Sequence, residues 1–400
     1  MPRQDPLDIW RKDLAKAFPD LTKPQLKGLA HWSFGMTLAR CCSLDSVAAY
    51  MADWLEQPEL SVRSRLREWY LPADLKSGTK RGGKRQELDV TTCFAPLLRW
   101  LCRDWPQPRL ALALDASTLD DRFVLLAISV LYRSCAFPVA WRILPATAKG
   151  RWKPHWLDLL QAISGVVPAN WLVVALTDRG LWAKWLFEKI QDLGWHPLMR
   201  INRGHFRPAG STAFVPLAQL IPQVEMGWRG QGTAFSTPGR QVDGTLLGWW
   251  GSGHKEPWLI LSDLIPQQSN ACWYGLRSWI EQGFKDSKSG GWQWQHTRME
   301  DPERAERLWL AIAVTTLWLL RVGGSAEEAA LQASHTETRV LGRCEPGCTC
   351  WRTSSVFARG HRAILMAMLK HRRLPLGQWL PEPWPTLPLP ASPRREKTHT

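Results

Sequence analysis

The sequence predicts an α/β protein in which a mixed-sheet core follows a helical region. Three observations support this fold class. Residues 1–105 carry apolar residues mostly at helical spacing, residues 106–322 alternate strand-length apolar runs with helical segments, and residues 203–256 are Gly-rich and β-like. At 400 residues the chain exceeds one compact core, so more than one domain is expected.

The first 105 residues are predicted to be mostly helical. Helices are expected at Leu21 to Arg40, Leu44 to Leu55 and Ser61 to Tyr70. Residues 61–85, which include the cationic loop Lys80-Arg-Gly-Gly-Lys-Arg85, hold eight Lys or Arg against two acids. We therefore predict a helical N-terminal DNA-binding domain in which Arg81, Lys84 and Arg85 contact phosphates. The alternative is a solvated basic surface, because no helix-turn-helix signature is clean here.

The core is predicted from the order strand, strand, strand, helix, strand, helix, strand. The expected strands are 109–115, 122–133, 136–144, 171–177 and 196–202, and the expected helices are 156–165 and 181–193. A right-handed crossover through the first of these helices brings the first and fourth strands side by side. This order looks like a ribonuclease-H-like core, with a β insertion at about 203–256 and a returning strand at 258–262.

The first and fourth strands are each predicted to end at an aspartate. The run Arg109-Leu-Ala-Leu-Ala-Leu is followed by Asp115, and Trp171-Leu-Val-Val-Ala-Leu-Thr is followed by Asp178. The carboxyl edge of such a sheet is where sites of α/β proteins usually form. A single aspartate after a strand is more often a helix cap or a turn residue, so this pair needs support from elsewhere in the chain.

That support is the string Tyr274, Arg277, Glu281 and Lys288, with the spacing Tyr-x2-Arg-x3-Glu-x6-Lys. On one continuous helix the four positions fall within an arc of about 60°, with Lys288 about 10 Å along the axis from Glu281. One carboxylate then lies among three side chains that bind phosphate. A helix stop is expected at Gly290-Gly291. The alternative is a solvated helix face with a chance order of charges.

Asp115, Asp178 and Glu281 together suit a pair of Mg²⁺ ions, with Mn²⁺ as a substitute. Mg²⁺ prefers hard oxygen ligands and is commonly bound by a few carboxylates and by substrate phosphates. Two such ions activate the attacking oxygen and steady the leaving oxygen of an in-line displacement at phosphorus. We expect these three residues to be catalytic metal ligands. Arg277 lies close enough to Glu281 to influence both the ions and a phosphate.

These residues resemble the DDE triad of bacterial insertion-sequence transposases, over about residues 109–322. The string from Tyr274 to Lys288 matches the signature of the insertion-sequence-four-like subgroup, which includes hairpin-forming cut-and-paste enzymes. Asp115-Ala-Ser-Thr118 fits the small hydroxyl residues that follow the first acid of the family, and Asp178-Arg-Gly180 fits the Asp-Arg-Gly of the second. The resemblance implies two divalent ions on the triad, and contacts from Tyr274, Arg277 and Lys288 to transposon-end phosphates.

The resemblance also implies an activity and partners. The chain would be a DNA transposase that cuts transposon ends and joins them to target DNA by phosphodiester hydrolysis and transesterification. Its partners would be double-stranded DNA, as terminal inverted repeats and target, and a second copy of the chain in a synaptic complex. An aromatic residue of the β insertion, Trp249 or Trp250, would hold a flipped base, although no motif selects between them. The expected location is the bacterial cytoplasm, in association with the nucleoid.

Composition agrees with a nucleic-acid partner. The net charge is +15, although a basic chain is equally compatible with an anionic membrane surface. Most of the 26 Trp are expected in the core, as for Trp309 and Trp318. The nine Cys show no secreted disulfide framework. Cys344, Cys348 and Cys350 lack a clear fourth metal ligand, so free thiols of a cytosolic protein are expected.

The sequence predicts neither export nor a membrane span. No apolar signal region follows Met1. The apolar stretch Leu308–Leu320 is shorter than the roughly 20 residues that span a bilayer, so it is interpreted as a buried core helix. The C-terminal region, 323–400, is expected to be partly helical, with a disordered Pro-rich tail from Pro381 to Thr400.

Two other function classes stay open. A catalytically inactive, transposase-derived DNA-binding protein or repressor would keep the basic patches without needing the triad. A carboxylate-pair hydrolase such as a glycosidase would suit the aromatic content, but it leaves Arg277, Lys288 and the net charge unexplained. The sequence favours the active transposase, because like charges buried together without a metal are unfavourable.

Overall fold

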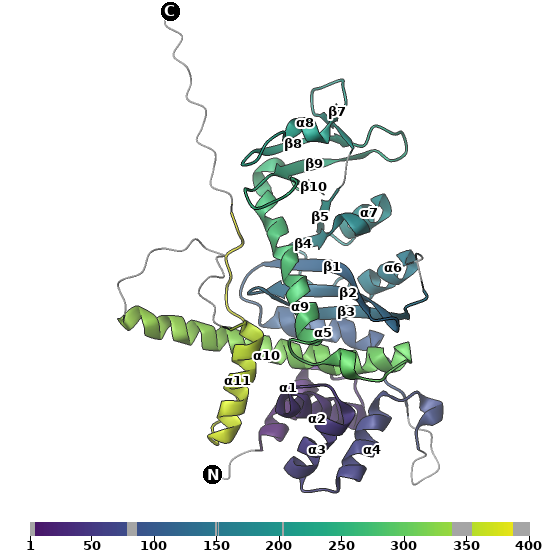
Figure 1. Cartoon of the computed structure of the whole chain (residues 1–400), viewed down its shortest axis with the longest axis vertical. Coiled ribbons are helices and arrows are strands. Elements are labelled where there is room, and N and C mark those ends of the chain that lie inside the picture. The colour runs from purple at the N-terminus through teal and green to yellow at the C-terminus, as the bar shows by residue number, and fades with distance from the viewer. Residues whose placement is uncertain are drawn as a thin grey trace, which may run out of the picture.

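A ten-stranded sheet runs through the molecule, with the strand order β3-β2-β1-β4-β5-β10-β9-β8-β6-β7. The structure is a computed structural model, and it describes residues 5–77, 86–148, 150, 152–201, 204–337 and 354–386. Helices α1 to α4 lie at one end of the elongated molecule and strands β6 to β9 lie at the other (Figure 1). The predicted mixed α/β architecture with N-terminal helices is confirmed.

The first five strands form the part of the sheet that was predicted as the core. They are β1 (Arg109–Leu119), β2 (Phe123–Tyr132), β3 (Cys135–Pro145), β4 (Leu172–Thr177) and β5 (His196–Arg200). β1, β2 and β3 pair antiparallel, whereas β4 is parallel to both β1 and β5. The crossover helix α6 (Lys153–Ala162) precedes β4, and α7 (Lys184–Asp192) joins β4 to β5. The prediction that the first and fourth strands lie side by side is confirmed.

β1 does not end where the sequence suggested. It continues past Asp115 to Leu119, and its antiparallel pairing with β2 runs on from Asp115 opposite Ala127. The parallel partner β4 does stop, at Thr177 opposite Leu114. The prediction of a strand end at Asp115 was therefore wrong, because the hairpin with β2 carries β1 beyond the edge at which β4 ends.

The β insertion extends the same sheet. Its strands are β6 (His205–Pro208), β7 (Val215–Pro216), β8 (Gly227–Ala234) and β9 (Val242–Trp249), with the short helix α8 (Leu217–Leu220) among them. The returning strand β10 (Trp258–Ser262) pairs antiparallel with β5 on one side and with β9 on the other. Through β10 the inserted hairpins become the far edge of the core sheet.

The N-terminal region is helical, as predicted. Its helices are α1 (Pro6–Ala17), α2 (Lys23–Ala39), α3 (Leu44–Leu55), α4 (Glu59–Tyr70), η1 (Ala73–Leu75) and α5 (Thr91–Arg103). The three predicted helices are confirmed within a few residues. α2 begins with a capping box, in which Thr22 and Gln25 satisfy each other's exposed backbone groups. Arg81, Lys84 and Arg85 lie outside the described residues.

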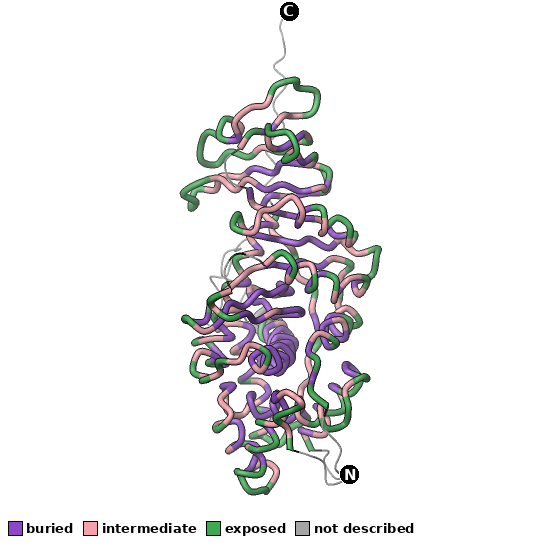
Figure 2. Tube along the Cα trace, turned by 90° about the vertical axis from the view of Figure 1, so that its right-hand side faces the viewer, coloured by how far each residue is buried: buried purple, intermediate pink, exposed green. Residues whose placement is uncertain are grey.

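The helix α10 (Pro302–Glu337) crosses the centre of the protein and is seen nearly end-on as a buried coil in Figure 2. Trp309 and Trp318 are each only 1% exposed, which confirms their prediction as core residues. The segment Pro302–Gln332 is long and apolar enough to cross a membrane, but 94% of its apolar window is buried inside the protein. The predicted length was too short, because the helix extends beyond the apolar stretch, but the interpretation as a core helix is confirmed.

The C-terminal region docks on α10. The helix α11 (Val356–Leu369) packs against α10, and residues 370–386 continue along the core without regular structure. The side chain of Arg109 donates to the carbonyl of Glu382 at 2.8 Å, and the backbone N–H of Arg133 donates to the Glu382 carboxylate at 2.7 Å. Disorder from Pro381 onward was therefore a wrong prediction for residues 381–386. Residues 387–400 and the cluster Cys344, Cys348 and Cys350 lie outside the described residues.

The segment that carries the Tyr-to-Lys string packs across one face of the sheet. It consists of η3 (Pro266–Gln268), η4 (Ala271–Ser278), α9 (Trp279–Ser287) and η5 (Trp294–His296). Figure 1 shows α9 in front of β1, β2 and β3, and it contacts all three strands. Gly283 makes this close approach possible, because a Cβ added there would lie 2.7 Å from the carbonyl oxygen of Ala136 on β3.

A buried carboxyl on α9 makes folding stability depend on pH. Asp286 is 3% exposed, and burial raises its pKa to about 7, although Gln282 donates to one of its oxygens at 2.7 Å. The native state holds this proton above the pH at which the unfolded state releases it, so stability falls as pH rises through 7. We expect the unfolding free energy to drop by about 1.4 kcal/mol between pH 6 and 8 from this group. Urea denaturation of the protein and of Asp286→Asn, whose profile should be flatter by that amount, checks this; parallel profiles would exclude Asp286 as the source.

Candidate active site

The alternation of side chains along β1 and β4 directs both aspartates to one face of the sheet. Ala111 and Ala113 on β1 are buried in the cluster beneath η4, and Asp115 follows at the same two-residue interval. Val174 and Leu176 on β4 belong to the same cluster, and Asp178 follows them. Because Leu114 pairs with Thr177, the two aspartates are the next residues on neighbouring strands. They meet at the edge of the sheet where β4 ends.

The Tyr-to-Lys string does not lie on one α-helix, as was predicted. Tyr274 and Arg277 are on the 3₁₀-helix η4, Glu281 is on α9, and Lys288 follows the last residue of α9 with φ −99° and ψ −126°. In a 3₁₀-helix residues three apart lie on the same side, which moves Tyr274 and Arg277 off the predicted arc. α9 ends at Ser287, ahead of the expected stop at Gly290. The single narrow arc was therefore a wrong prediction.

The guanidinium group of Arg277 lies among the three carboxylates. Its Nη2 is 2.7 Å from Oδ2 of Asp115 and 3.7 Å from Oδ2 of Asp178. Its Nη1 is 3.5 Å from Oε1 of Glu281, one helical turn along the chain. The three acids come from β1, from the residue after β4 and from α9. The structure thus brings together all three residues that were predicted to form the triad, around one cation.

The three carboxylates differ in their exposure to solvent. The side chain of Asp115 is 15% exposed, whereas those of Asp178 and Glu281 are 37% and 69% exposed. Burial raises the pKa of Asp115 to about 6, and Asp178 and Glu281 add to this rise, whereas Arg277 and the backbone N–H of Ala116 oppose it. Oδ1 of Asp178 accepts from the backbone N–H groups of Gly180 and Leu181, so this residue also caps the 3₁₀ turn that follows it (η2, Arg179–Leu181). Asp178 therefore caps this turn and also lies 3.7 Å from Arg277.

Tyr274 and Lys288, which were predicted to contact phosphates, are in contact with other parts of the protein in this structure. Tyr274 is 5% exposed, and burial raises its pKa to about 12. Nζ of Lys288 donates to Oγ of Ser117 at 2.9 Å and to the carbonyl oxygen of Thr118 at 2.7 Å. These contacts connect the end of α9 to the C-terminal end of β1, just beyond Asp115. An ammonium group has three donors, so one of them is left for a phosphate after these two bonds.

One contacting residue, Arg200, was missed in the sequence. Arg200 at the end of β5 pairs with Glu256 at 2.9 Å, and its positive charge near Tyr274 opposes the rise that burial causes in the pKa of that residue. The same two-residue alternation would have found it, since Leu198 is buried in the cluster below η4 and Arg200 follows on that face.

Of the two candidates for base binding, Trp249 pairs across the sheet with Trp258, whereas the indole N–H of Trp250 donates to the carbonyl of His254 at 2.9 Å. Neither contact selects between them.

The donor set of the site fits a divalent cation with a preference for oxygen. Three carboxylates supply hard ligands of the kind that Mg²⁺ uses. In the part of the chain that the structure describes, however, no three acidic, His or Cys side chains are spaced to hold a metal ion. Arg277 lies between the three carboxylates at the distances given above. In this structure the three carboxylates therefore share one guanidinium as their counter-ion.

Comparison with known proteins adds a family to this geometry. Residues 146–318 match the family described as transposase DDE domain; this is under half of the chain and includes Asp178 and Glu281 but not Asp115. No curated protein matches the chain. A cryo-EM structure of the piggyBac transposase synaptic complex with hairpin DNA is similar at 11% identity and a TM-score of 0.30, over 85% of this chain and 81% of that one. A similarity of that size does not by itself establish a shared fold. Over residues 146–318, this chain is similar to the DDE domain of transposases.

Proposed function

We propose that this chain is a DNA transposase of the DDE type, which cuts transposon ends and joins them to target DNA. The observation that carries the proposal is the convergence of Asp115, Asp178 and Glu281 from three separate elements at one edge of the sheet. The similarity of residues 146–318 to the transposase DDE domain supports it. We further propose that the sheet is a ribonuclease-H-like core and that the 274–288 string is that of the insertion-sequence-four-like subgroup.

In this proposal each residue has a role at phosphorus. Asp115, Asp178 and Glu281 hold two Mg²⁺ ions, or Mn²⁺, which when bound activate the attacking oxygen and stabilise the leaving oxygen. A water oxygen forms a bond to phosphorus and the P–O3′ bond breaks, which releases a 3′-hydroxyl. In the joining step the oxygen of that hydroxyl bonds to a phosphorus of a second strand, the P–O3′ bond of that strand breaks, and the departing 3′-oxygen takes up the proton. Arg277 and Lys288 bind neighbouring phosphates of the strand, since a guanidinium grips a phosphate in bidentate fashion and an ammonium acts as a point charge.

The proposed organisation follows the chain. Residues 1–105 would be the DNA-binding domain, residues 106–322 the catalytic core with its β insertion, and residues 323–400 the C-terminal region. Two copies would act together in a synaptic complex with double-stranded DNA, in the bacterial cytoplasm. The charge of +15 supports a polyanionic partner.

The decisive test uses the DNA that flanks the gene. Terminal inverted repeats bracketed by short direct repeats would identify the substrate. A linear duplex that carries one such end, incubated with purified protein and Mg²⁺, should be cut at the repeat boundary to leave a 3′-hydroxyl. Specific binding without cutting, in Mg²⁺ and in Mn²⁺ alike, would reject the proposal in favour of the alternative below.

That alternative is a non-catalytic, transposase-derived DNA-binding protein or repressor. One observation favours it: Arg277 offsets part of the repulsion among the three carboxylates, so their closeness has an explanation other than metal binding. The triad alone is thus weaker support for metal-dependent activity than the sequence suggested. Exposed Glu281 and half-exposed Asp178 still favour the active enzyme, because a purely structural counter-ion for Arg277 needs no solvent-facing acids.

Salt dependence tests the role of the basic segment. Lys and Arg that bind phosphates release counterions, so DNA affinity falls linearly with salt on logarithmic axes. Replacing Arg81, Lys84 and Arg85 together with Gln should make that slope shallower by about 2 to 3, close to one unit per lost contact. Fluorescence anisotropy of a labelled duplex at several salt concentrations measures the slope. An unchanged slope would place these residues away from DNA and leave the interpretation of a solvated surface.

A further inference from the structure

One side chain in this structure stands where a metal ion is expected. Nη1 and Nη2 of Arg277 lie within 2.7 to 3.7 Å of oxygens from all three carboxylates. Only the contact with Asp115 is a hydrogen bond; those with Asp178 and Glu281 are longer charge contacts. Three acids and one guanidinium leave a net negative charge at the site. The guanidinium of Arg277 therefore neutralises only part of the negative charge of the three carboxylates.

The backbone of Arg277 is anchored to the sheet, and its side chain is joined to that backbone by rotatable bonds. The neighbouring residues Tyr274 and Leu276 are buried in the cluster beneath η4, which anchors this segment to the sheet. The Nε–H of Arg277 is buried and has no hydrogen-bond partner in the described part of the chain. A buried N–H without a partner is unfavourable, so this arrangement leaves one of the guanidinium's strong donors unused. Rotation about the side-chain torsions can move the head group while the backbone stays in place.

We propose that Arg277 is an internal counter-ion that occupies the metal site in the metal-free protein and is transferred to a DNA phosphate when divalent ions bind. This proposal rests on the proposed function and assigns a regulatory step to the same site. Divalent ions and the guanidinium compete for the same oxygens, so each weakens the binding of the other. A phosphate beside the site removes the competitor, because it accepts the guanidinium in bidentate geometry.

The consequence is coupling between DNA and metal. Without DNA the carboxylates are occupied by Arg277, and divalent ions bind weakly. With DNA the guanidinium has a second partner, and the site becomes free for ions. Thermodynamic reciprocity requires that ions strengthen DNA binding by the same factor. The arrangement would keep the nuclease site unloaded until a strand is in place.

Binding of Mn²⁺ tests the proposal without any need for turnover. The probe is Mn²⁺ alone, titrated into DNA-free protein and followed by electron paramagnetic resonance of the free ion. Arg277→Gln should bind Mn²⁺ at least about fivefold more tightly than the natural chain, the lower end of ordinary coupling between sites. Arg277→Lys, which keeps the charge but loses the fork that spans three acids, should lie between the two.

The matched control is Arg179→Gln. Arg179 follows Asp178 directly, but its guanidinium pairs with Glu256 at 2.6 Å and makes no contact with the triad that the structure describes. A general loss of positive charge near the site would strengthen Mn²⁺ binding in both variants, whereas displacement of a bound guanidinium would do so only at Arg277. Equal affinities for Arg277→Gln and the natural chain, or equal gains in both variants, would overturn the proposal. Thermal melting verifies that each variant is folded. If Arg277→Gln does not fold, the Mn²⁺ affinity of Arg277→Lys is compared with that of the natural chain instead.

A second measurement asks where the guanidinium goes. Saturating duplex DNA should raise the Mn²⁺ affinity of the natural chain but have a smaller effect on Arg277→Gln. An equal rise in both would exclude the transfer to phosphate. Failure of the underlying function gives a different result: Asp115→Asn would then bind Mn²⁺ as well as the natural chain does.

Discussion

Asp115→Asn, Asp178→Asn and Glu281→Gln are each expected to lower the rate of DNA-end cleavage by roughly 10³-fold or more, while binding of the same DNA persists. The rate should fall at least as far as it does when an enzyme loses one hydrogen-bond donor to its transition state. The reason is that a neutral amide keeps the shape of the acid but is no longer an anionic metal ligand. Labelled end DNA incubated with Mg²⁺ and resolved on a denaturing gel measures the rate. Near-normal cutting by one variant would remove that residue from the triad.

The structure predicts that these variants fold. Asp178 and Glu281 are exposed enough for an amide to be solvated, at 37% and 69% of their side-chain surface. Asp115 is mostly buried, but burial already raises its pKa to about 6, so its site tolerates the neutral form. The matched control is Asp158→Asn, because Asp158 is an exposed aspartate on α6, away from the triad. A loss of cleavage in this control as well would mean that the assay reports general damage.

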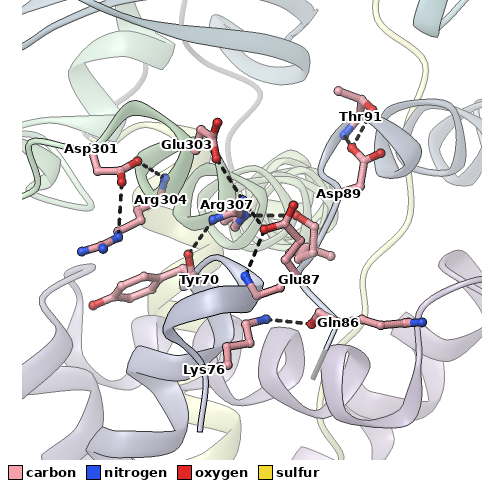
Figure 3. A network of polar contacts seen from close by, with 12 residues as sticks. Tyr70, Lys76, Gln86, Glu87, Asp89, Thr91, Asp301, Glu303, Arg304 and Arg307 are labelled. Atoms are coloured by element: carbon pink, nitrogen blue, oxygen red, sulfur yellow. Dashed lines mark hydrogen bonds and ion pairs between the residues drawn. The ribbon is translucent and has the colours of Figure 1, made fainter. Parts of the chain in front are cut away.

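Arg307→Met is expected to lower the free energy of unfolding by about 2–4 kcal/mol, because two backbone carbonyls lose their donor. Arg307 on α10 is 5% exposed, and its guanidinium donates to the carbonyl of Tyr70 at 3.1 Å (Figure 3) and to that of Leu88, also at 3.1 Å. It also lies 3.3 Å from the carboxylates of Glu87 and Glu303. Tyr70 ends α4 and Leu88 precedes α5, so this one side chain joins the end of α4 and the start of the α5 region to the core helix.

The control for this prediction lies on the same helix. Arg304 pairs with Asp301 at 3.4 Å, and its side chain is 30% exposed. Surface pairs of this kind contribute little, so Arg304→Met should cost less than about 1 kcal/mol. Urea denaturation of both variants measures the difference. Equal losses would show that the contacts of Arg307 with Tyr70 and Leu88 do not hold the N-terminal helices on α10.

Local patterns in the sequence were sufficient for the elements of the core. Apolar runs of strand length and helical spacing placed five strands and two crossover helices within a few residues of their positions. The two-residue period of a strand also determines that Asp115 follows Ala113, and Asp178 follows Leu176, on one face. Side-chain direction in a regular strand depends only on neighbours along the chain, so this shared face follows once the strands are placed.

Contacts between distant segments decided the rest. β1 passes Asp115 because β2 pairs with it, and residues 381–386 are ordered because Arg109 and Arg133 bind Glu382 across the chain. The string from Tyr274 to Lys288 bends at the junction of η4 and α9, where the segment packs on the sheet. Helical spacing carries no information about such packing.

The sequence by itself therefore identified three acids, Asp115, Asp178 and Glu281, which the structure places around one guanidinium. Only the tertiary structure decided that Arg277 lies between them and that Lys288 binds the end of β1 at Ser117 and Thr118. The physical reason is that a long cationic side chain reaches its partners through several rotatable bonds. Its final position depends on the groups that folding gathers around it: Asp115 lies 162 positions from Arg277 in the chain, and Ser117 lies 171 positions from Lys288.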